Sequence, residues 1–192
     1  MNPSAQPVPE TSSGTGESNR ELISGLIRDV PDFPKPGVVF KDITPLLGDA
    51  AGFAASIEEI VAGAPKDVDF VVGMEARGFI FAAPVALRLG AGFVPVRKPG
   101  KLPGDVLSES FALEYGEEVL NIHADAIKPG ARVLVVDDVL ATGGTVAATA
   151  NLLKHFGADL VAVSVVMELS FLGGRERLAG NGIDSLHPVI TV

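Results

Sequence analysis

Cysteine is absent from this sequence of 192 residues. Its absence excludes disulfide bonds, thiolate metal ligands and a cysteine nucleophile, and it fits a reducing compartment. Positive charge is also scarce, and the formal net charge of −9 argues against a nucleic-acid surface. The basic residues cluster only in RKPGK at 97–101, a patch sized for one multiply charged ligand rather than for a duplex. The three histidines lie far apart and show no metal-ligand spacing.

Long apolar runs are missing as well. No run reaches the roughly 20 residues that span a bilayer. The N-terminal segment is rich in Pro, Ser, Gly and Thr and lacks the apolar stretch of a secretory signal. Because it has little to bury, residues 1–18 are predicted to form a disordered tail. The hydrophobic fraction of 47% predicts one globular domain over residues 19–192, and we expect the protein to be cytoplasmic.

The spacing of apolar residues predicts alternating helices and strands. Helices are expected over residues 20–30, 50–63, 78–90 and 144–157. Strands are expected over residues 69–74, 92–98, 117–127, 131–138 and 158–169. This alternation is typical of an α/β fold with a doubly wound parallel sheet, which binds ligands at the carboxyl ends of its strands. Residues 99–116 are rich in turn formers and show no clear core face, which predicts a functional lid or a flexible arm.

One stretch, VLVVDDVLATGGT at 133–145, combines a buried strand with a glycine turn. Gly143 and Gly144 allow the backbone to turn tightly and to approach a ligand closely. The helix that begins near Gly144 directs its free N–H groups into this turn, and Thr142 and Thr145 add hydroxyl donors. No lysine follows the glycines, unlike in the GxxxxGK[ST] nucleotide loop. A turn that offers N–H and hydroxyl donors but no cation is suited to bind a sugar phosphate monoester.

Two adjacent carboxylates, Asp137 and Asp138, precede this turn. Both would repel a phosphate group, so we expect them one sugar length away, where they accept hydrogen bonds from vicinal ribose hydroxyls. The alternative is a strand that simply ends in solvated aspartates before a helix.

The thirteen residues resemble the phosphoribosyl-pyrophosphate (PRPP) signature of type I phosphoribosyltransferases. The ATGGT ending, PDFPKPGVVFKD at 31–42 and FALEYG at 111–116 are similar to the adenine phosphoribosyltransferases among them. The resemblance runs from about residue 21 to about residue 178. It implies a parallel sheet flanked by helices, with a small hood and a flexible lid loop. It also implies a purine salvage reaction, in which adenine and PRPP, with Mg²⁺ bound mainly through PRPP, give AMP and pyrophosphate.

The resemblance also implies roles for single residues. Arg77 lies in the pyrophosphate loop, which in this family often holds a cis peptide, here between Glu75 and Ala76. Lys101 acts in a lid that excludes water, and Glu114 exchanges a proton with the purine N7. The binding of PRPP and AMP is assigned to Lys41, Arg97, Lys98, Tyr115, Asp137, Asp138, Ala141, Thr142, Gly143, Gly144 and Thr145. Taken alone, Arg77 could be a surface arginine at a helix start, and the RKPGK cations could form a solvated rim.

Adenine is expected to stack on Phe40, with Val39 offering backbone hydrogen bonds and Leu169 closing the opposite face. Phe40 and Leu169 could equally be core residues, and Lys41 stands where many members carry arginine. The strand segment 160–170 ends without the lysine that related 6-oxopurine enzymes use, which favours adenine over hypoxanthine or guanine.

The sequence leaves open two alternative functions and suggests one oligomeric state. The chain could be a regulator that senses PRPP and binds nucleic acid, or an enzyme that uses another base. We also expect a homodimer, as in related enzymes, with weak support from the apolar helix GFIFAAPVAL at 78–87.

Overall fold

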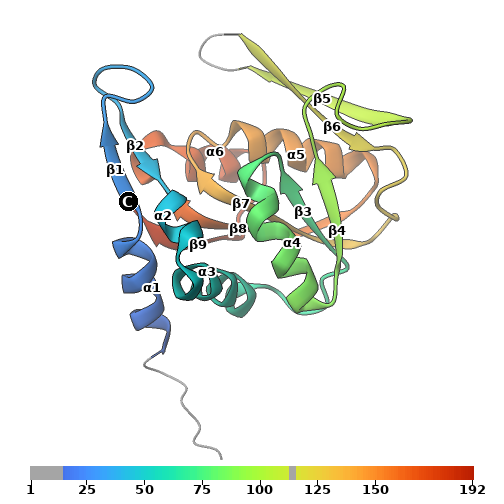
Figure 1. The fold of residues 1–192 in the computed structure, drawn as a ribbon. Coiled ribbons are helices and arrows are strands. Elements are labelled where there is room, and N and C mark those ends of the chain that lie inside the picture. The colour runs from blue at the N-terminus through green and yellow to red at the C-terminus, as the bar shows by residue number, and fades with distance from the viewer. Residues whose placement is uncertain (1–14, 113–115) are drawn as a thin grey trace, which may run out of the picture. The chain divides into compact units, whose positions relative to one another are not determined.

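The computed structural model describes residues 15–112 and 116–192 (Figure 1). The chain divides into two compact units, residues 1–55 and 56–192. The boundary between them falls within helix α3 (Ala50–Gly63), which coincides with the helix predicted from apolar spacing. None of the described helices combines the length and the apolar character needed to cross a membrane.

The first unit contains two helices and a hairpin. They are α1 (Thr15–Gly25), β1 (Arg28–Pro31), β2 (Val39–Asp42) and α2 (Thr44–Gly48). Strands β1 and β2 pair antiparallel, with Val30 opposite Phe40. The helix predicted over 20–30 is therefore wrong at its end, because Gly25 has low helix propensity and Pro31 biases Val30 toward extended backbone. Helix α1 also begins within the segment 1–18 that was predicted to be a tail; residues 1–14 lie outside the described residues.

A parallel sheet of five strands forms the second unit, in the order β4-β3-β7-β8-β9. The strands are β3 (Phe70–Met74), β4 (Gly92–Val96), β7 (Arg132–Leu140), β8 (Asp159–Glu168) and β9 (Leu186–Thr191). The first four match predicted strands, and β4 lies at the edge, as the proline within it suggests. Strand β9 is not predicted from the sequence; it pairs with β8 from Val163 to Glu168. The doubly wound parallel sheet is confirmed.

Helices α4 (Arg77–Leu89) and α5 (Gly144–His155) cover opposite faces of this sheet (Figure 1). In the strand order, the connection from β3 through α4 to β4 moves in one direction, and the connection from β7 through α5 to β8 moves in the other. Because both connections are right-handed, the two helices lie on different faces. Val133 and Val135 belong to the core cluster that includes Leu152 of α5. Leu134, equally buried, points to the other face because side chains alternate along a strand.

A second hairpin, β5 (Val106–Ala112) and β6 (Glu117–His123), stands apart from the main sheet (Figure 1). Within residues 99–116, predicted to form a lid or a flexible arm without a clear core face, residues 106–112 form strand β5. Leu107 and Phe111 pack against the core, but Glu109 between them interrupts the apolar alternation. Glu109 accepts a hydrogen bond of 2.8 Å from the side-chain amide of Asn151. The inward-facing Glu109 thus finds its hydrogen-bond partner on α5. The local sequence around Glu109 does not reveal this partner.

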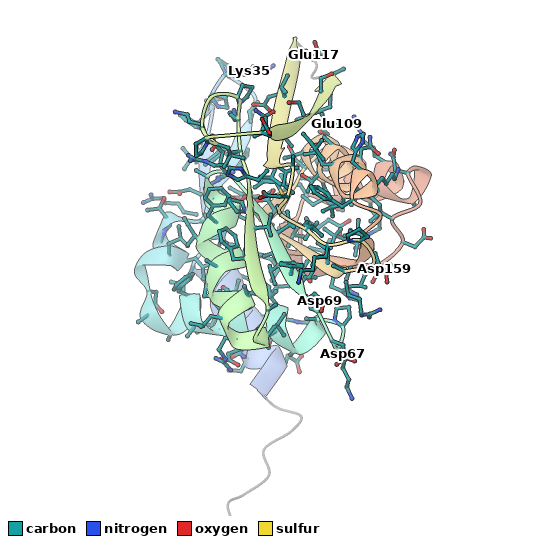
Figure 2. The ribbon with its side chains drawn as sticks, turned by 90° about the vertical axis from the view of Figure 1, so that its right-hand side faces the viewer. Lys35, Asp67, Asp69, Glu109, Glu117 and Asp159 are labelled. Atoms are coloured by element: carbon teal, nitrogen blue, oxygen red, sulfur yellow. The ribbon has the colours of Figure 1, made fainter. Side chains whose placement is uncertain are left out.

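Charged side chains gather at the amino ends of the strands. The backbone N–H of Arg132 donates to Asp69 at 2.8 Å, and its guanidinium lies 3.4 Å from the carboxylate of Asp159. Asp67, Asp69 and Asp159 lie together at this end, far from Glu109 and Glu117 of the hairpin (Figure 2). These exposed contacts each contribute little to stability. The turn at residues 141–145 lies at the opposite, carboxyl end of β7.

Candidate active site

The turn between β7 and α5 forms a small cavity of about 70 Å³, lined by Asp137 and residues 139–146. Gly143 adopts a left-handed conformation with φ of 77°, and no side chain caps the helix that follows. The first N–H groups of α5 therefore have no side-chain acceptor and point toward the turn. A helix N-terminus in this state favours an anion. Residues 141–145 are called the phosphate loop below.

A short helix, α6 (Gly174–Gly180), packs against the phosphate loop, backbone against backbone. A β-carbon on Gly174 would lie 2.3 Å from the carbonyl oxygen of Ala141. A β-carbon on Gly143 would lie 3.0 Å from the carbonyl oxygen of Gly174. Neither position has room for a larger side chain, so the two segments hold each other in place.

Asp137 and Asp138 are neighbours in sequence, and both carboxylates lie close to the start of α4. Asp137 lines the phosphate-loop cavity, and the start of α4 approaches it so closely that a β-carbon on Gly78 would lie 2.6 Å from its Oδ1. Oδ2 of Asp138 lies 2.9 Å from Nε of Arg77. This contact is an ion pair rather than a directed hydrogen bond, because Oδ2 lacks a donor with suitable geometry among the described residues. Both carboxylates thus lie beside the start of α4, and Asp137 also lines the phosphate-loop cavity.

Burial raises the pKa of both carboxyl groups. The pKa of Asp137 lies well above its ordinary value, because the group is buried and the charge of Asp138 lies beside it. The backbone N–H of Asp138, which donates to Asp137 at 3.0 Å, opposes this shift. Burial also raises the pKa of Asp138, and the guanidinium of Arg77 opposes that rise. The pair therefore favours carrying a proton.

The predicted pyrophosphate loop follows β3. The peptide bond between Glu75 and Ala76 is cis, as the resemblance predicts. The carboxylate of Glu75 lies 2.6 Å from Nε of Arg97, whose Nη1 donates to the carbonyl oxygen of Lys101 at 3.0 Å. Arg97 thereby joins this loop to the turn that follows β4.

The remaining cations of the basic patch differ in their contacts. Lys98 forms an ion pair with Glu118, and this hydrogen bond raises the pKa of Lys98. The ammonium group of Lys101 forms no ion pair with any residue in 15–112 or 116–192. Lys101 is therefore the cation of this patch whose charge is least compensated by described residues.

Residues predicted to bind adenine lie in different parts of the chain. In the first unit, the rings of Phe40 and Phe33 meet edge to face with centroids 5.2 Å apart, and Val39 is 51% exposed. Lys41 forms an ion pair of 2.7 Å with Asp29. In the second unit, the backbone N–H of Leu169 donates to Leu140 at 2.9 Å, which ties Leu169 to the end of β7.

Two predicted residues, Glu114 and Tyr115, lie outside the described residues, and their roles stay predictions.

Sequence reasoning missed the contacts that fix α6. Glu168, only 3% exposed, receives both Nε and Nη2 of Arg175 at 2.9 and 2.5 Å. This bidentate pair joins the end of β8 to the first turn of α6. The GGR sequence after the short 3₁₀ helix η1 (Ser170–Leu172) is the only local signal, and it does not reveal the partner of the arginine.

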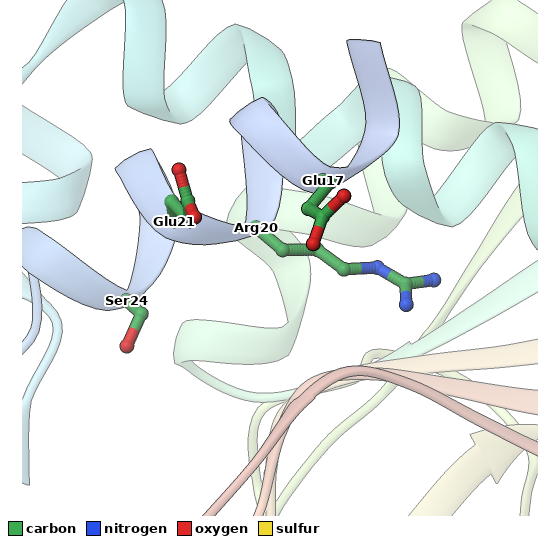
Figure 3. A pocket seen from close by; sticks show the side chains of 4 residues that line it. All are labelled: Glu17, Arg20, Glu21 and Ser24. Carbon is green, nitrogen blue, oxygen red and sulfur yellow. The ribbon is translucent and has the colours of Figure 1, made fainter. Parts of the chain in front are cut away.

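A wider hollow of about 760 Å³ lies elsewhere, in the first unit. Its lining consists of Glu17, Arg20, Glu21 and Ser24, all from α1 (Figure 3). Side chains of a single helix, without a converging turn or strand end, offer no arrangement for group transfer. The phosphate-loop cavity is smaller, but it combines uncapped helix amides, threonine hydroxyls and a carboxylate.

Comparisons with known proteins identify the family. The chain matches the model of the phosphoribosyl transferase domain over residues 41–177. Adenine phosphoribosyltransferase of Cutibacterium acnes is 65% identical over 173 residues, which cover 90% of this chain and 98% of that protein. The chain belongs to the adenine phosphoribosyltransferase family.

Solved structures of this family have the same fold. The adenine phosphoribosyltransferase of Thermoanaerobacter pseudethanolicus is 48% identical, with a TM-score of 0.85 over 90% of this chain and 99% of that one. The enzyme of Saccharomyces cerevisiae, complexed with an imino-altritol bisphosphate and adenine, is 36% identical, with a TM-score of 0.84 over 91% and 99% of the two chains. The parallel sheet flanked by helices and the predicted family are thereby confirmed.

The raised pKa values generate a prediction on stability. Between the ordinary pKa of 3.8 and the raised value, the folded state binds more protons than the unfolded state, so the free energy of unfolding falls as pH rises through this window. Asp137→Asn removes the buried charge, and we expect a higher melting temperature than wild type at pH 7 and a flatter dependence on pH. Calorimetric melting from pH 4 to pH 8 measures both.

Asp138→Asn is the matched control for this substitution. It removes the same charge but also the ion pair with Arg77, so its gain should be smaller. A melting temperature of Asp137→Asn at or below that of wild type at pH 7 would contradict the prediction.

Proposed function

We propose that this chain is a purine salvage enzyme that transfers the phosphoribosyl group of PRPP to adenine, giving AMP and pyrophosphate. The observation that carries the proposal is the phosphate loop, a cavity with uncapped helix amides and Asp137 on its wall, in a chain 65% identical to an adenine phosphoribosyltransferase. We expect the reaction to take place in the cytoplasm.

In this proposal the phosphate loop holds the 5-phosphate of PRPP. The amides of residues 142–145 and the hydroxyls of Thr142 and Thr145 donate to its oxygens. Asp137, on the wall of the same cavity, accepts hydrogen bonds from the ribose hydroxyls. We propose that Asp138 serves the ribose as well and that, through its ion pair with Arg77, it also orients that guanidinium.

Pyrophosphate leaves from C1 of the ribose, so positive charge develops there and negative charge on the leaving group. We propose that Arg77, Arg97, Lys98 and Lys101 contact the leaving group. Arg97 and Lys98 pair with Glu75 and Glu118, so binding would require an exchange of carboxylate for pyrophosphate oxygens. Lys101 has no carboxylate partner among the described residues, so it could bind pyrophosphate without first breaking an ion pair with them.

The cofactor we propose is Mg²⁺, carried mainly by the oxygens of PRPP and pyrophosphate. In the described ranges, His, Asp and Glu side chains do not come together in threes as a protein metal site requires, so substrate and water oxygens would supply most ligands. When bound, the ion neutralises charge on the leaving group.

For the base, we propose that adenine stacks on Phe40, donates its amino group to backbone carbonyls near Val39, and is covered by Leu169. Glu114 exchanges the proton at N7, and Tyr115 contacts the ribose phosphate. These roles rest on the family resemblance.

Base identity follows from the end of β8. A 6-oxopurine needs a cationic donor for its carbonyl, and residues 167–170 supply none. Arg175 lies near this strand end, but Glu168 compensates its charge through two hydrogen bonds. An unsatisfied buried carbonyl costs about 1–3 kcal/mol, equivalent to roughly 5- to 150-fold in affinity.

An assay panel of four bases with PRPP and Mg²⁺ tests the proposed function. We expect turnover of adenine and little or none of hypoxanthine, guanine or orotate. Comparable rates with hypoxanthine would contradict the assignment. Absence of pyrophosphate release with every base would instead favour a regulator that only senses PRPP.

Lys101→Ala tests the role of the uncompensated cation. A group that acts mainly on the leaving pyrophosphate stabilises the transition state more than the ground state, so kcat should fall by about 10- to 100-fold while KM for PRPP changes less. Steady-state kinetics measure both constants. Lys128→Ala, in a turn at the opposite end of β7, is the control and should leave both unchanged. An unchanged kcat with only a raised KM would mean that Lys101 merely aids binding.

We also propose a homodimer. Apolar side chains remain exposed on α4 and β4, with Leu87 at 82%, Ile80 at 38% and Phe93 at 37% exposure. We expect sedimentation to give a dimer and Leu87→Lys to weaken it, whereas Leu22→Lys, on α1, should not. A wild-type monomer with full activity would contradict this proposal.

A further inference from the structure

One arginine beside the phosphate loop has no part in the functions described so far. In the nucleotide loop GxxxxGK[ST], the lysine stands directly before the Ser or Thr. In ATGGT the corresponding residue is Gly144, so this loop lacks its own cation. A β-carbon built on Gly144 would lie 3.4 Å from Nη1 of Arg177. The guanidinium of Arg177 therefore occupies the space into which a side chain at 144 would extend.

The position of Arg177 is fixed by the helix that carries it. Gly174, one turn earlier on α6, lies against the carbonyl group of Ala141, and Leu178 is fully buried. Arg175 joins the same helix to Glu168 at the end of β8. These three contacts hold the backbone of the helix, and so the point from which the Arg177 side chain extends, beside the loop.

The charge of Arg177 is available. Across residues 15–112 and 116–192, its guanidinium forms no ion pair and no side-chain hydrogen bond. Phe111 lies on the same side of Gly144, where its ring would be 3.1 Å from the added β-carbon. A phosphate monoester carries up to about two negative charges, and uncharged amides and hydroxyls balance them only in part.

We propose that Arg177 binds the 5-phosphate of PRPP and AMP, as the cation that the phosphate loop itself lacks. The inference rests on the proposed function, because it takes the ligand of the loop to be the phosphate of these nucleotides. Arginine suits this position because its planar group presents several donors to phosphate oxygens.

Calorimetric titration of AMP and adenosine tests the inference, since the two ligands differ only in the phosphate. Arg177→Gln should raise the Kd for AMP by about tenfold at low ionic strength and leave the Kd for adenosine unchanged. The effect should shrink at 0.5 M salt, because salt screens a partly exposed charge. Arg177→Lys keeps the charge and should lose less, whereas Arg177→Glu should weaken AMP more than Arg177→Gln.

Lys154→Gln is the matched control. It removes the same charge at the other end of α5 and should leave the AMP affinity within twofold of wild type. An AMP affinity of Arg177→Gln equal to that of this control would overturn the inference. So would an equal loss for AMP and adenosine, which would indicate a structural role. Wild-type protein that binds adenosine but not AMP, or neither ligand, would contradict the proposed function itself.

Discussion

Two adjacent carboxylates at the end of β7 determine how the site is built. Asp137 lines the phosphate-loop cavity and lies beside Gly78, whereas Asp138 pairs with Arg77 at the start of α4. One strand end thereby serves both crossovers of the sheet, the β3 side through α4 and the β8 side through α5. Two identical residues side by side acquire different surroundings without any difference in sequence. The proposed ribose and pyrophosphate contacts follow from this division.

Carboxylates compensate most of the cations around the site. Arg77 pairs with Asp138, Arg97 with Glu75 and Lys98 with Glu118. These pairs keep the long basic side chains ordered, but they also compete with an anionic ligand. Lys101 and Arg177 lack such partners among the described residues, so their attraction for an anion is opposed by fewer local charges. Compensated and uncompensated cations therefore differ in how much of their charge a substrate can use.

Much of the fold could be predicted from the sequence, because the relevant signals are local. The apolar spacing of residues 50–63 defines α3, and the continuous apolar run before Asp137 defines a buried strand. Strand β5 could not be predicted, since Glu109 faces inward and is satisfied by Asn151, 42 positions later. The phosphate loop could be predicted because its glycines and threonines all lie within five consecutive residues. The pair of Glu168 with Arg175 and the approach of Arg177 to Gly144 depend on α6 folding back, which only the tertiary structure specifies.

The hydrogen bond between Glu109 and Asn151 restricts where the β5–β6 hairpin can bend. A rigid swing of the whole hairpin away from α5 would break this bond and withdraw Phe111 from Gly144, exposing an apolar ring and a buried glycine together. Such a movement would cost more than a local one. Segment 98–105, which carries Lys101, takes part in neither of these two contacts and is held instead by Arg97, which donates to the carbonyl oxygen of Lys101. The basic patch and the wall beside the phosphate loop therefore depend on different hydrogen bonds of the same hairpin region.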